Sequence, residues 1–148
     1  MIYLIEEPKE NTYKDLINVA FDICTEFILV QRDQIALNEK SLLLLNKLKP
    51  YVKRQEKQDY WPGTMLLGHS ATVYYFDCNQ ELKCIIENEV NRLYEWMQPD
   101  KLEDLCFYKD NKEWLIVTAH ERIGTIKTDE QEEIKRISNI NGIRLEIL

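Results

Sequence analysis

The sequence predicts an α+β fold, in which an N-terminal helical hairpin precedes a small antiparallel or mixed sheet. Two stretches with helical spacing of apolar residues follow each other near the start of the chain. Runs rich in aromatic and β-branched residues dominate the remainder, and several of these runs are adjacent in sequence. Adjacent strands favour antiparallel or mixed pairing, with helices mainly on one side. The expected order is α-α-β-α-β-β-β-α-β, in a single domain over 1–148.

The first two helices are expected at about 11–32 and 38–55. Asn11 or Thr12 is a suitable N-cap for the first helix, whose wide apolar arc predicts that it is largely buried. Pro50 falls inside the second helix and should kink or break it near Lys49. Two helices in succession most simply pack as an antiparallel hairpin.

The middle of the chain predicts a strand and then a third helix. Ala71 to Phe76 alternates in aromatic and β-branched residues, as a strand does. Asp77 or Asn79 would cap the following helix, and Pro99 would end it. Its apolar stripe would contain Leu82, Ile86, Val90, Leu93 and Met97.

A β-hairpin is expected over residues 102–121, around the turn-like stretch 109–112. Its second arm is apolar on both faces, which predicts a central strand with Trp114 in the core. A further strand at 123–128, a short helix begun by a Thr128–Gln131 capping box, and a one-sided terminal strand at 143–147 complete the prediction.

Charge and composition limit the classes of function. The net charge is −7, and residues 75–148 carry 16 acidic and 10 basic side chains. An acidic half disfavours non-specific nucleic-acid binding and is compatible with a basic protein partner. No apolar run approaches the roughly 20 residues of a membrane-spanning helix, and no export signal is recognised, so a cytoplasmic protein with four reduced cysteines is expected.

Three segments resemble a small family of uncharacterised bacterial proteins: ATVYYF (71–76), LEDLCFY (102–108) and EWLIVTAHE (113–121). The resemblance covers about the central third of the chain and implies a bacterial cytosolic origin, with no known activity to transfer. The size and charge of the chain are also common among immunity proteins for secreted toxins. The sequence contains no dinucleotide-binding, phosphate-loop, nucleophile-elbow or zinc-protease motif.

The candidate site lies at the end of the predicted hairpin, where His120 and Glu121 follow an apolar run. An enzyme could use His120 with Glu121, Glu103 or Cys106 as titratable or nucleophilic partners. A hairpin turn centred on Asp110–Asn111 would pair Cys106 with Leu115, however, far from His120. Neighbouring strand residues also point to opposite faces, so His120 and Glu121 should not chelate one metal ion. No metal or cofactor is therefore predicted.

Two classes of function remain open. The favoured one is a small non-catalytic binding protein, an immunity-like interaction module, whose contact residues would include Trp61, Glu103, Asp104, His120 and Glu121. The alternative is an enzyme of unknown reaction built on His120. An enzyme requires a cleft in which His120 meets a second titratable group, whereas a binding protein requires an exposed patch.

Overall fold

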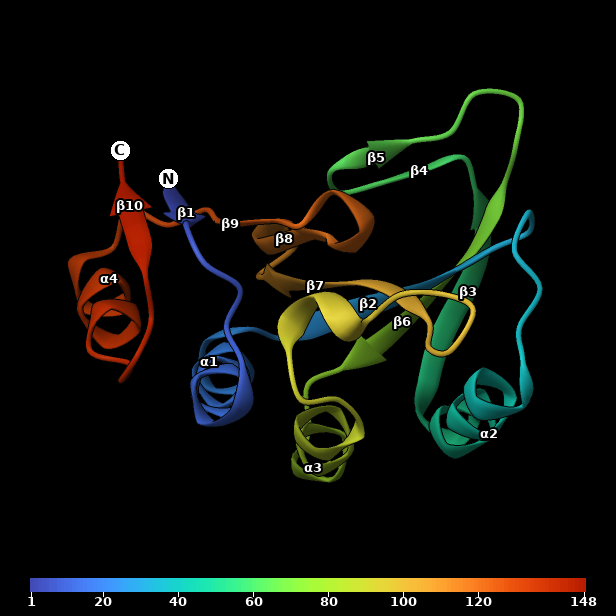
Figure 1. The fold of residues 1–148 in the computed structure, drawn as a ribbon, viewed down its shortest axis with the longest axis horizontal. Coiled ribbons are helices and arrows are strands. Elements are labelled where there is room, and N and C mark those ends of the chain that lie inside the picture. The colour runs from blue at the N-terminus through green and yellow to red at the C-terminus, as the bar shows by residue number, and fades with distance from the viewer.

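Eight strands form one continuous sheet in the computed structural model, which describes all residues from 1 to 148 (Figure 1). All the strand pairs in it are antiparallel. From one edge to the other the sheet contains β10 (Leu145–Ile147), β1 (Ile2–Leu4), β9 (Ile123–Ile126), β8 (Lys112–Thr118), β7 (Glu103–Lys109), β2 (Glu26–Arg32), β6 (Ala71–Asp77) and β3 (Val52–Gln58).

Helices and a small second hairpin flank this sheet. Figure 1 shows α1, α2 and α3 on one side of it, and the hairpin of β4 and β5 on the other side. The helices are α1 (Glu10–Ile23), α2 (Glu39–Leu48), α3 (Gln80–Glu89) and α4 (Gln131–Ser138). The hairpin consists of β4 (Tyr60–Trp61) and β5 (Thr64–Met65), and three short 3-10 turns are η1 (Lys49–Tyr51), η2 (Leu93–Glu95) and η3 (Ala119–Glu121).

The predicted N-terminal helical hairpin is wrong, although the α+β class is right. Strands and helices alternate from the first residues onward, in the order β-α-β-α-β-β-β-β-α-β-β-β-α-β. The sheet is also larger than predicted, because β1 and two segments expected to be at least partly helical are strands. These two segments are 26–32, at the end of the first predicted helix, and 52–58, which begins inside the second predicted helix and continues past its end.

Strand β2 occupies the end of the first predicted helix. Helix α1 ends at Ile23, and Phe27, Ile28, Leu29 and Val30 are all fully buried in the strand that follows. The strand pairs with β6 on one side and β7 on the other, so that both of its edges and both of its faces are covered. A strand buried in this way has an unbroken apolar run, which periodicity alone does not distinguish from a buried helix.

Helix α2 breaks near Lys49, as Pro50 predicted. The chain passes through the 3-10 turn η1 and continues as the edge strand β3, not as a helix. Most residues of β3 are exposed, and they therefore show no apolar repeat of either period.

Strand β6 and the start of α3 agree with the prediction, but the end of α3 does not. The side chain of Asn79 caps α3 by accepting a hydrogen bond from the backbone N–H of Leu82 at 2.8 Å. The helix ends at Glu89, ten residues before Pro99. Leu93 consequently lies in η2, and Met97 lies in the loop that follows it.

The central hairpin is confirmed, with a two-residue turn at Asp110 and Asn111. Both residues have positive φ angles, 49° and 67°, as tight hairpin turns require. Trp114 is buried, as predicted, but the strand register shifts beside it. Leu115 therefore pairs with Phe107 instead of with Cys106.

The C-terminal elements lie close to their predicted positions, except for the capping box. Helix α4 begins after Glu130 with no side-chain cap, and Thr128 instead donates a hydrogen bond to the carboxylate of Glu133 at 2.6 Å. Gly142 has a φ of 84°, and β10 follows it.

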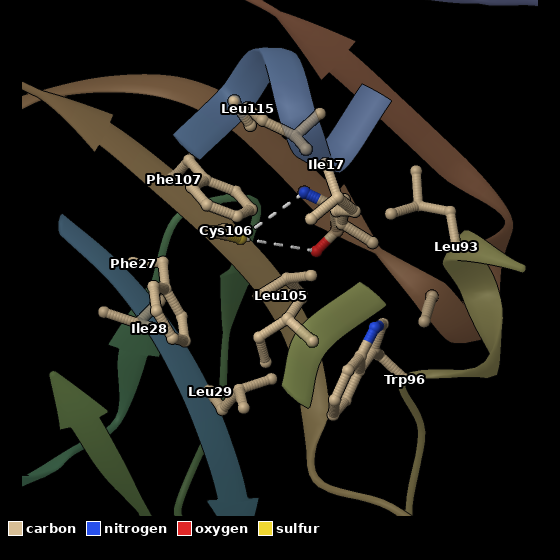
Figure 2. Packing of buried hydrophobic residues seen from close by; sticks show 14 of the residues in the cluster. Ile17, Phe27, Ile28, Leu29, Leu93, Trp96, Leu105, Cys106, Phe107 and Leu115 are labelled. Atoms are coloured by element: carbon tan, nitrogen blue, oxygen red, sulfur yellow. Dashed lines mark hydrogen bonds between the residues drawn. The ribbon is translucent and has the colours of Figure 1, made fainter. Parts of the chain in front are cut away.

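The core lies between the sheet and the helix layer. Figure 2 shows Ile17 of α1 and Leu93 packed with Phe107 and Leu115 of the sheet, all of them buried. Trp96 belongs to the same core, and its indole N–H donates a hydrogen bond to the Tyr13 hydroxyl at 2.9 Å. The helix-covered face of the sheet is thus largely apolar.

Candidate functional site

A buried polar cluster lies where β2 ends, β7 begins and the β4–β5 hairpin folds over the sheet. We call it the Arg32 cluster, and it consists of Arg32, Trp61, Gln98, Glu103, Asp104 and His120. It brings together four of the five predicted partner-contacting residues. Trp61, Glu103 and Asp104 are buried, whereas His120 is exposed.

A β-bulge at the start of β7 aims Asp104 into the cluster. Val30 of β2 pairs with Glu103 and Ile28 pairs with Cys106, so β7 has one more residue than β2 between these pairs. Asp104 has a φ of 56°, a left-handed conformation that Asp tolerates better than most residues. Bulges of this kind often redirect one side chain at a functional site.

The two carboxylate oxygens of Asp104 join the β4–β5 hairpin to the turn after β8. Oδ2 accepts a hydrogen bond from the indole N–H of Trp61, and Oδ1 accepts one from the backbone N–H of Ala119, both at 2.9 Å. The hydroxyl of Thr118 also donates to the carbonyl oxygen of Gly63, in the hairpin turn. The hairpin and η3 are therefore held against the same end of the sheet.

Arg32 pairs with the second buried carboxylate, that of Glu103. Nε of Arg32 lies 2.8 Å from Oε2 of Glu103, and its guanidinium carbon lies 5.3 Å from the centre of the Trp61 ring. Gln98 fixes the backbone beside this pair, because its Oε1 accepts from the Arg32 N–H at 2.7 Å and its Nε2 donates to the carbonyl oxygens of Arg32 and Ile35. The backbone N–H of Gln98 in turn donates to Glu103.

The cluster contains two buried carboxylates, of which Glu103 pairs with the guanidinium of Arg32 and Asp104 accepts hydrogen bonds from neutral groups. Burial raises the pKa of Glu103 above its ordinary value, although the charge of Arg32 opposes this shift. Burial also raises the pKa of Asp104, against the opposing hydrogen bonds from Ala119 and Trp61. Perturbed carboxyl groups of this kind occur at functional sites and in structural networks alike.

His120 and Glu121 lie together at the exposed rim of the cluster. The prediction that they point to opposite faces of a strand is wrong, because both residues lie in η3, with Nε2 of His120 3.9 Å from Oε1 of Glu121. The side chains are 45% and 58% exposed. Nδ1 of His120 also lies 3.5 Å from a terminal nitrogen of Arg32.

Cys106 is not brought to His120. Its thiol is fully buried between β7 and β8, where Sγ donates to the carbonyl oxygen of Val117 and accepts from the Val117 N–H (Figure 2). Burial raises the pKa of this thiol. His69, the second histidine, is exposed in the loop after β5. No group of three or more His, Cys, Asp or Glu side chains converges to hold a metal ion.

Sequence reasoning did not find Arg32 and Gln98, two of the six members of the cluster. The helical period over 11–32 predicts that Arg32 ends a helix, with no contact to Glu103. The available signal was that Gln31 and Arg32 follow the unbroken apolar run 27–30, because polar residues after such a run often mark the end of a buried strand. Gln98 had no comparable signal, since its partners are backbone groups distant in sequence.

The outer side of the β4–β5 hairpin is apolar and exposed. Trp61 pairs with Thr64 on the inner side, whereas Tyr60 pairs with Met65 on the outer side. Tyr60 is 58% exposed, Met65 73% and Leu67, in the loop that follows, 85%. We call these three residues the hairpin patch.

Five hollows of the surface have volumes of about 140 to 560 Å³, and only one of them, of about 390 Å³, reaches the Arg32 cluster, at Gln98. None is lined by Arg32, Glu103, Asp104 or His120.

No helix has both the length and the apolar character needed to cross a bilayer. Comparison of the chain with protein families, with curated proteins and with solved structures finds no match.

Proposed function

We propose that this chain is a small, non-catalytic, cytoplasmic binding protein that presents the hairpin patch to a protein partner. One observation carries the proposal: the β4–β5 hairpin has a buried inner side and an apolar outer side. Trp61 faces inward and bonds to Asp104, while Tyr60 and Met65 face outward into solvent.

The anchoring of the hairpin supports a binding role. Trp61 donates a hydrogen bond to Asp104, and the carbonyl oxygen of Gly63 accepts one from Thr118. These bonds fix the hairpin that carries the exposed side chains. A surface that is already ordered loses less conformational entropy when it binds. Tyr and Met are also among the residue types enriched in protein interfaces.

The surrounding charge favours a basic partner. Asp59 and Glu121 are exposed close to the hairpin and to its anchor, and neither pairs with a lysine or arginine side chain. The net charge of −7 would further attract a basic protein over longer range. Within this proposal, the chain is an immunity-like protein that covers a basic surface on its target.

The buried residues of the Arg32 cluster act indirectly in this proposal. Trp61, Glu103 and Asp104 hold the hairpin and η3 in place, and His120 and Glu121 contribute the polar rim of the contact surface. An enzyme built on His120 is less well supported, because the carboxylates nearest to it are either buried in a bonded network or open to solvent.

A capture experiment with a matched control tests the proposal. The tagged wild-type chain, Tyr60→Ser/Met65→Ser and Leu42→Ser/Leu43→Ser are each incubated with a lysate of the bacterium that encodes the protein. Leu42 and Leu43 are exposed leucines on α2, so the control removes a similar apolar area from another surface. Bound proteins are identified at about 50 mM and about 500 mM salt.

We expect the wild type and the α2 variant to retain one basic protein, more at low salt than at high salt. The hairpin variant should lose it. Retention of the same protein by all three chains would show that the hairpin patch is not the contact surface. If only the α2 variant failed to capture this protein, the contact surface would lie on α2 and not on the hairpin patch.

A further inference from the structure

The two edges of the large sheet differ in how they are protected. At the β3 edge, a bulge between Val52 and Arg54 interrupts the pairing, and the exposed residues that follow include Arg54 and Lys57. Bulges of this kind block the addition of another strand. At the opposite edge, β10 has no bulge and no proline, and Ile147 is 49% exposed. Strand β10 thus ends the sheet without a bulge (Figure 1).

The hydrogen bonds between β1 and β10 identify the backbone groups that are free. The carbonyl oxygen of Arg144 accepts from the Ile5 N–H, and the Leu148 N–H donates to the carbonyl oxygen of Met1, both at 2.9 Å. Alternate residues of an antiparallel strand direct their polar groups to the same side. Arg144, Glu146 and Leu148 therefore face β1, while the N–H and C=O of Leu145 and Ile147 face the free edge.

The side chains of this segment form a pattern that complements itself. Ile143, Leu145 and Ile147 alternate with Arg144 and Glu146, so reading IRLEI backwards exchanges only the two charges. Arg144 is 67% exposed, and its single acidic neighbour is Glu6, at 3.9 Å. Glu146 is exposed and has no ion-pair partner within the chain.

We propose that a second copy of this chain adds to the β10 edge, antiparallel, about a two-fold axis at Leu145. In this register the two copies of Leu145 exchange their free N–H and C=O groups. Arg144 of each copy then lies directly opposite Glu146 of the other, in a non-hydrogen-bonded pair, where side chains approach most closely. The two sheets become one continuous sheet across the axis.

Charge selects this register over the neighbouring ones. An axis at Glu146 would place two glutamates opposite each other, and an axis at Arg144 would place two arginines together. Like charges in directly opposed positions are destabilising. An axis between two residues is also unsuitable, because residues with outward-facing groups would then meet residues whose groups already bond to β1.

The apolar surface near β10 provides the burial that such an interface needs. Half of the exposed large apolar side chains lie in or beside β10, β1 and β9: Met1, Tyr3, Ile5, Ile123, Ile147 and Leu148. In the proposed register Ile147 packs against Ile143 of the other copy, and the two Leu145 side chains meet at the axis. The association removes Leu145 and Ile147, at the edge itself, from water.

Charge reversal tests the register directly. Glu146→Arg and Arg144→Glu each place like charges opposite each other at both pairs of the dimer. Each should raise the dissociation constant of the dimer on the order of tenfold or more, since cross-strand charge pairs contribute a few tenths to about 1 kcal/mol each. An equimolar mixture of the two variants places Arg opposite Glu at both positions and should restore dimers as heterodimers. The double variant Arg144→Glu/Glu146→Arg should restore homodimers.

Sedimentation velocity over a wide concentration range measures the association, with circular dichroism as the check that each variant is folded. Glu56→Arg, on the opposite edge strand, is the matched control and should associate like the wild type. A wild-type chain that stays monomeric at about 1 mM would overturn the proposal. The proposal would also be overturned if neither single charge reversal changed the dissociation constant of the dimer, or if a mixture of the two variants formed no heterodimers.

Discussion

The indole N–H of Trp61 donates a hydrogen bond to Oδ2 of Asp104 at 2.9 Å, across 43 residues of sequence. The other oxygen of the same carboxylate accepts from the backbone of Ala119. One buried side chain thus holds both the β4–β5 hairpin and the turn that presents His120. Because Asp104 has a left-handed conformation within a bulge, the sheet itself sets the direction of this side chain.

Trp61→Phe should destabilise the protein by about 1–3 kcal/mol, the usual cost of leaving one buried polar atom without its partner. Phenylalanine keeps much of the apolar contact but has no N–H for Asp104. Urea denaturation measures the change in the free energy of unfolding. Tyr60→Phe is the control, because it removes a polar group from the exposed neighbour and should change stability by less than about 0.5 kcal/mol. Equal midpoints for the two variants would mean that the Trp61–Asp104 bond does not anchor the hairpin.

Local signals in the sequence were sufficient for the elements with a strong residue preference, a clear cap or a clear turn. Ala71 to Asp77 is rich in the aromatic and β-branched residues of a strand, Asn79 caps α3, and Asp110–Asn111 forms the turn of the central hairpin. In each case the determinant is a residue or a short period within the element itself. Such determinants do not depend on the partner that covers the element.

The helix predictions for 26–32 and 52–58 are wrong for opposite reasons. Phe27 to Val30 is covered on both faces, so its continuous apolar run shows neither a helical nor a strand period. The helical period of α1, directly before it, therefore has no visible end before the strand. Residues 52–58 are mostly exposed, so they have no apolar residues to place. In the first segment, the β-branched Ile28 and Val30 and the short length of the run favoured a strand.

The candidate site was predicted in part. Trp61 and Asp104 bond directly, but Glu103 and His120 join them only through Arg32, which the helical period over 11–32 predicts to be in a helix. The contacts among them depend on the bulge at Asp104 and on the folding of the hairpin over the sheet. Both are long-range features, and neither has a local sequence signature.

The four cysteines should differ in reactivity in the folded protein. Cys84 is exposed, Cys78 is partly buried, and Cys24 and Cys106 are buried. Burial raises the pKa of Cys78 to about 12 and also raises the pKa of Cys24 and Cys106, so these thiols carry little reactive thiolate at neutral pH. An aromatic disulfide reagent should modify one thiol rapidly in the native protein and four after unfolding under argon.

Cys84→Ser is the control for this assignment and should remove the rapid phase alone. The thiol count of the unfolded protein checks the predicted reduced state separately. Two or fewer thiols after unfolding would mean that a disulfide forms in solution and that the protein belongs to an oxidising compartment.

Glu133 should make stability depend on pH in the acidic range. Burial by itself would raise the pKa of this carboxyl, but hydrogen bonds from Lys109, Thr128 and Trp114 outweigh it and lower the pKa from 4.5 to about 2. A carboxyl group with a lower pKa in the folded state stabilises the fold above its unfolded value. The contribution of Glu133 is therefore complete above about pH 4.5 and is lost as the pH falls toward 2.

Glu133→Gln should destabilise the protein at pH 7 by about 1–3 kcal/mol, because the amide cannot replace a carboxylate bonded to a lysine. The difference from wild type should shrink steadily between about pH 4.5 and 2, where the wild-type side chain also becomes neutral. Urea denaturation at pH 7, 5 and 3 measures both effects. Glu132→Gln, at the exposed neighbouring position of α4, removes the same charge and should leave stability nearly unchanged at each pH. A pH-independent difference between Glu133→Gln and wild type would show that Glu133 acts through packing, and not through its charge.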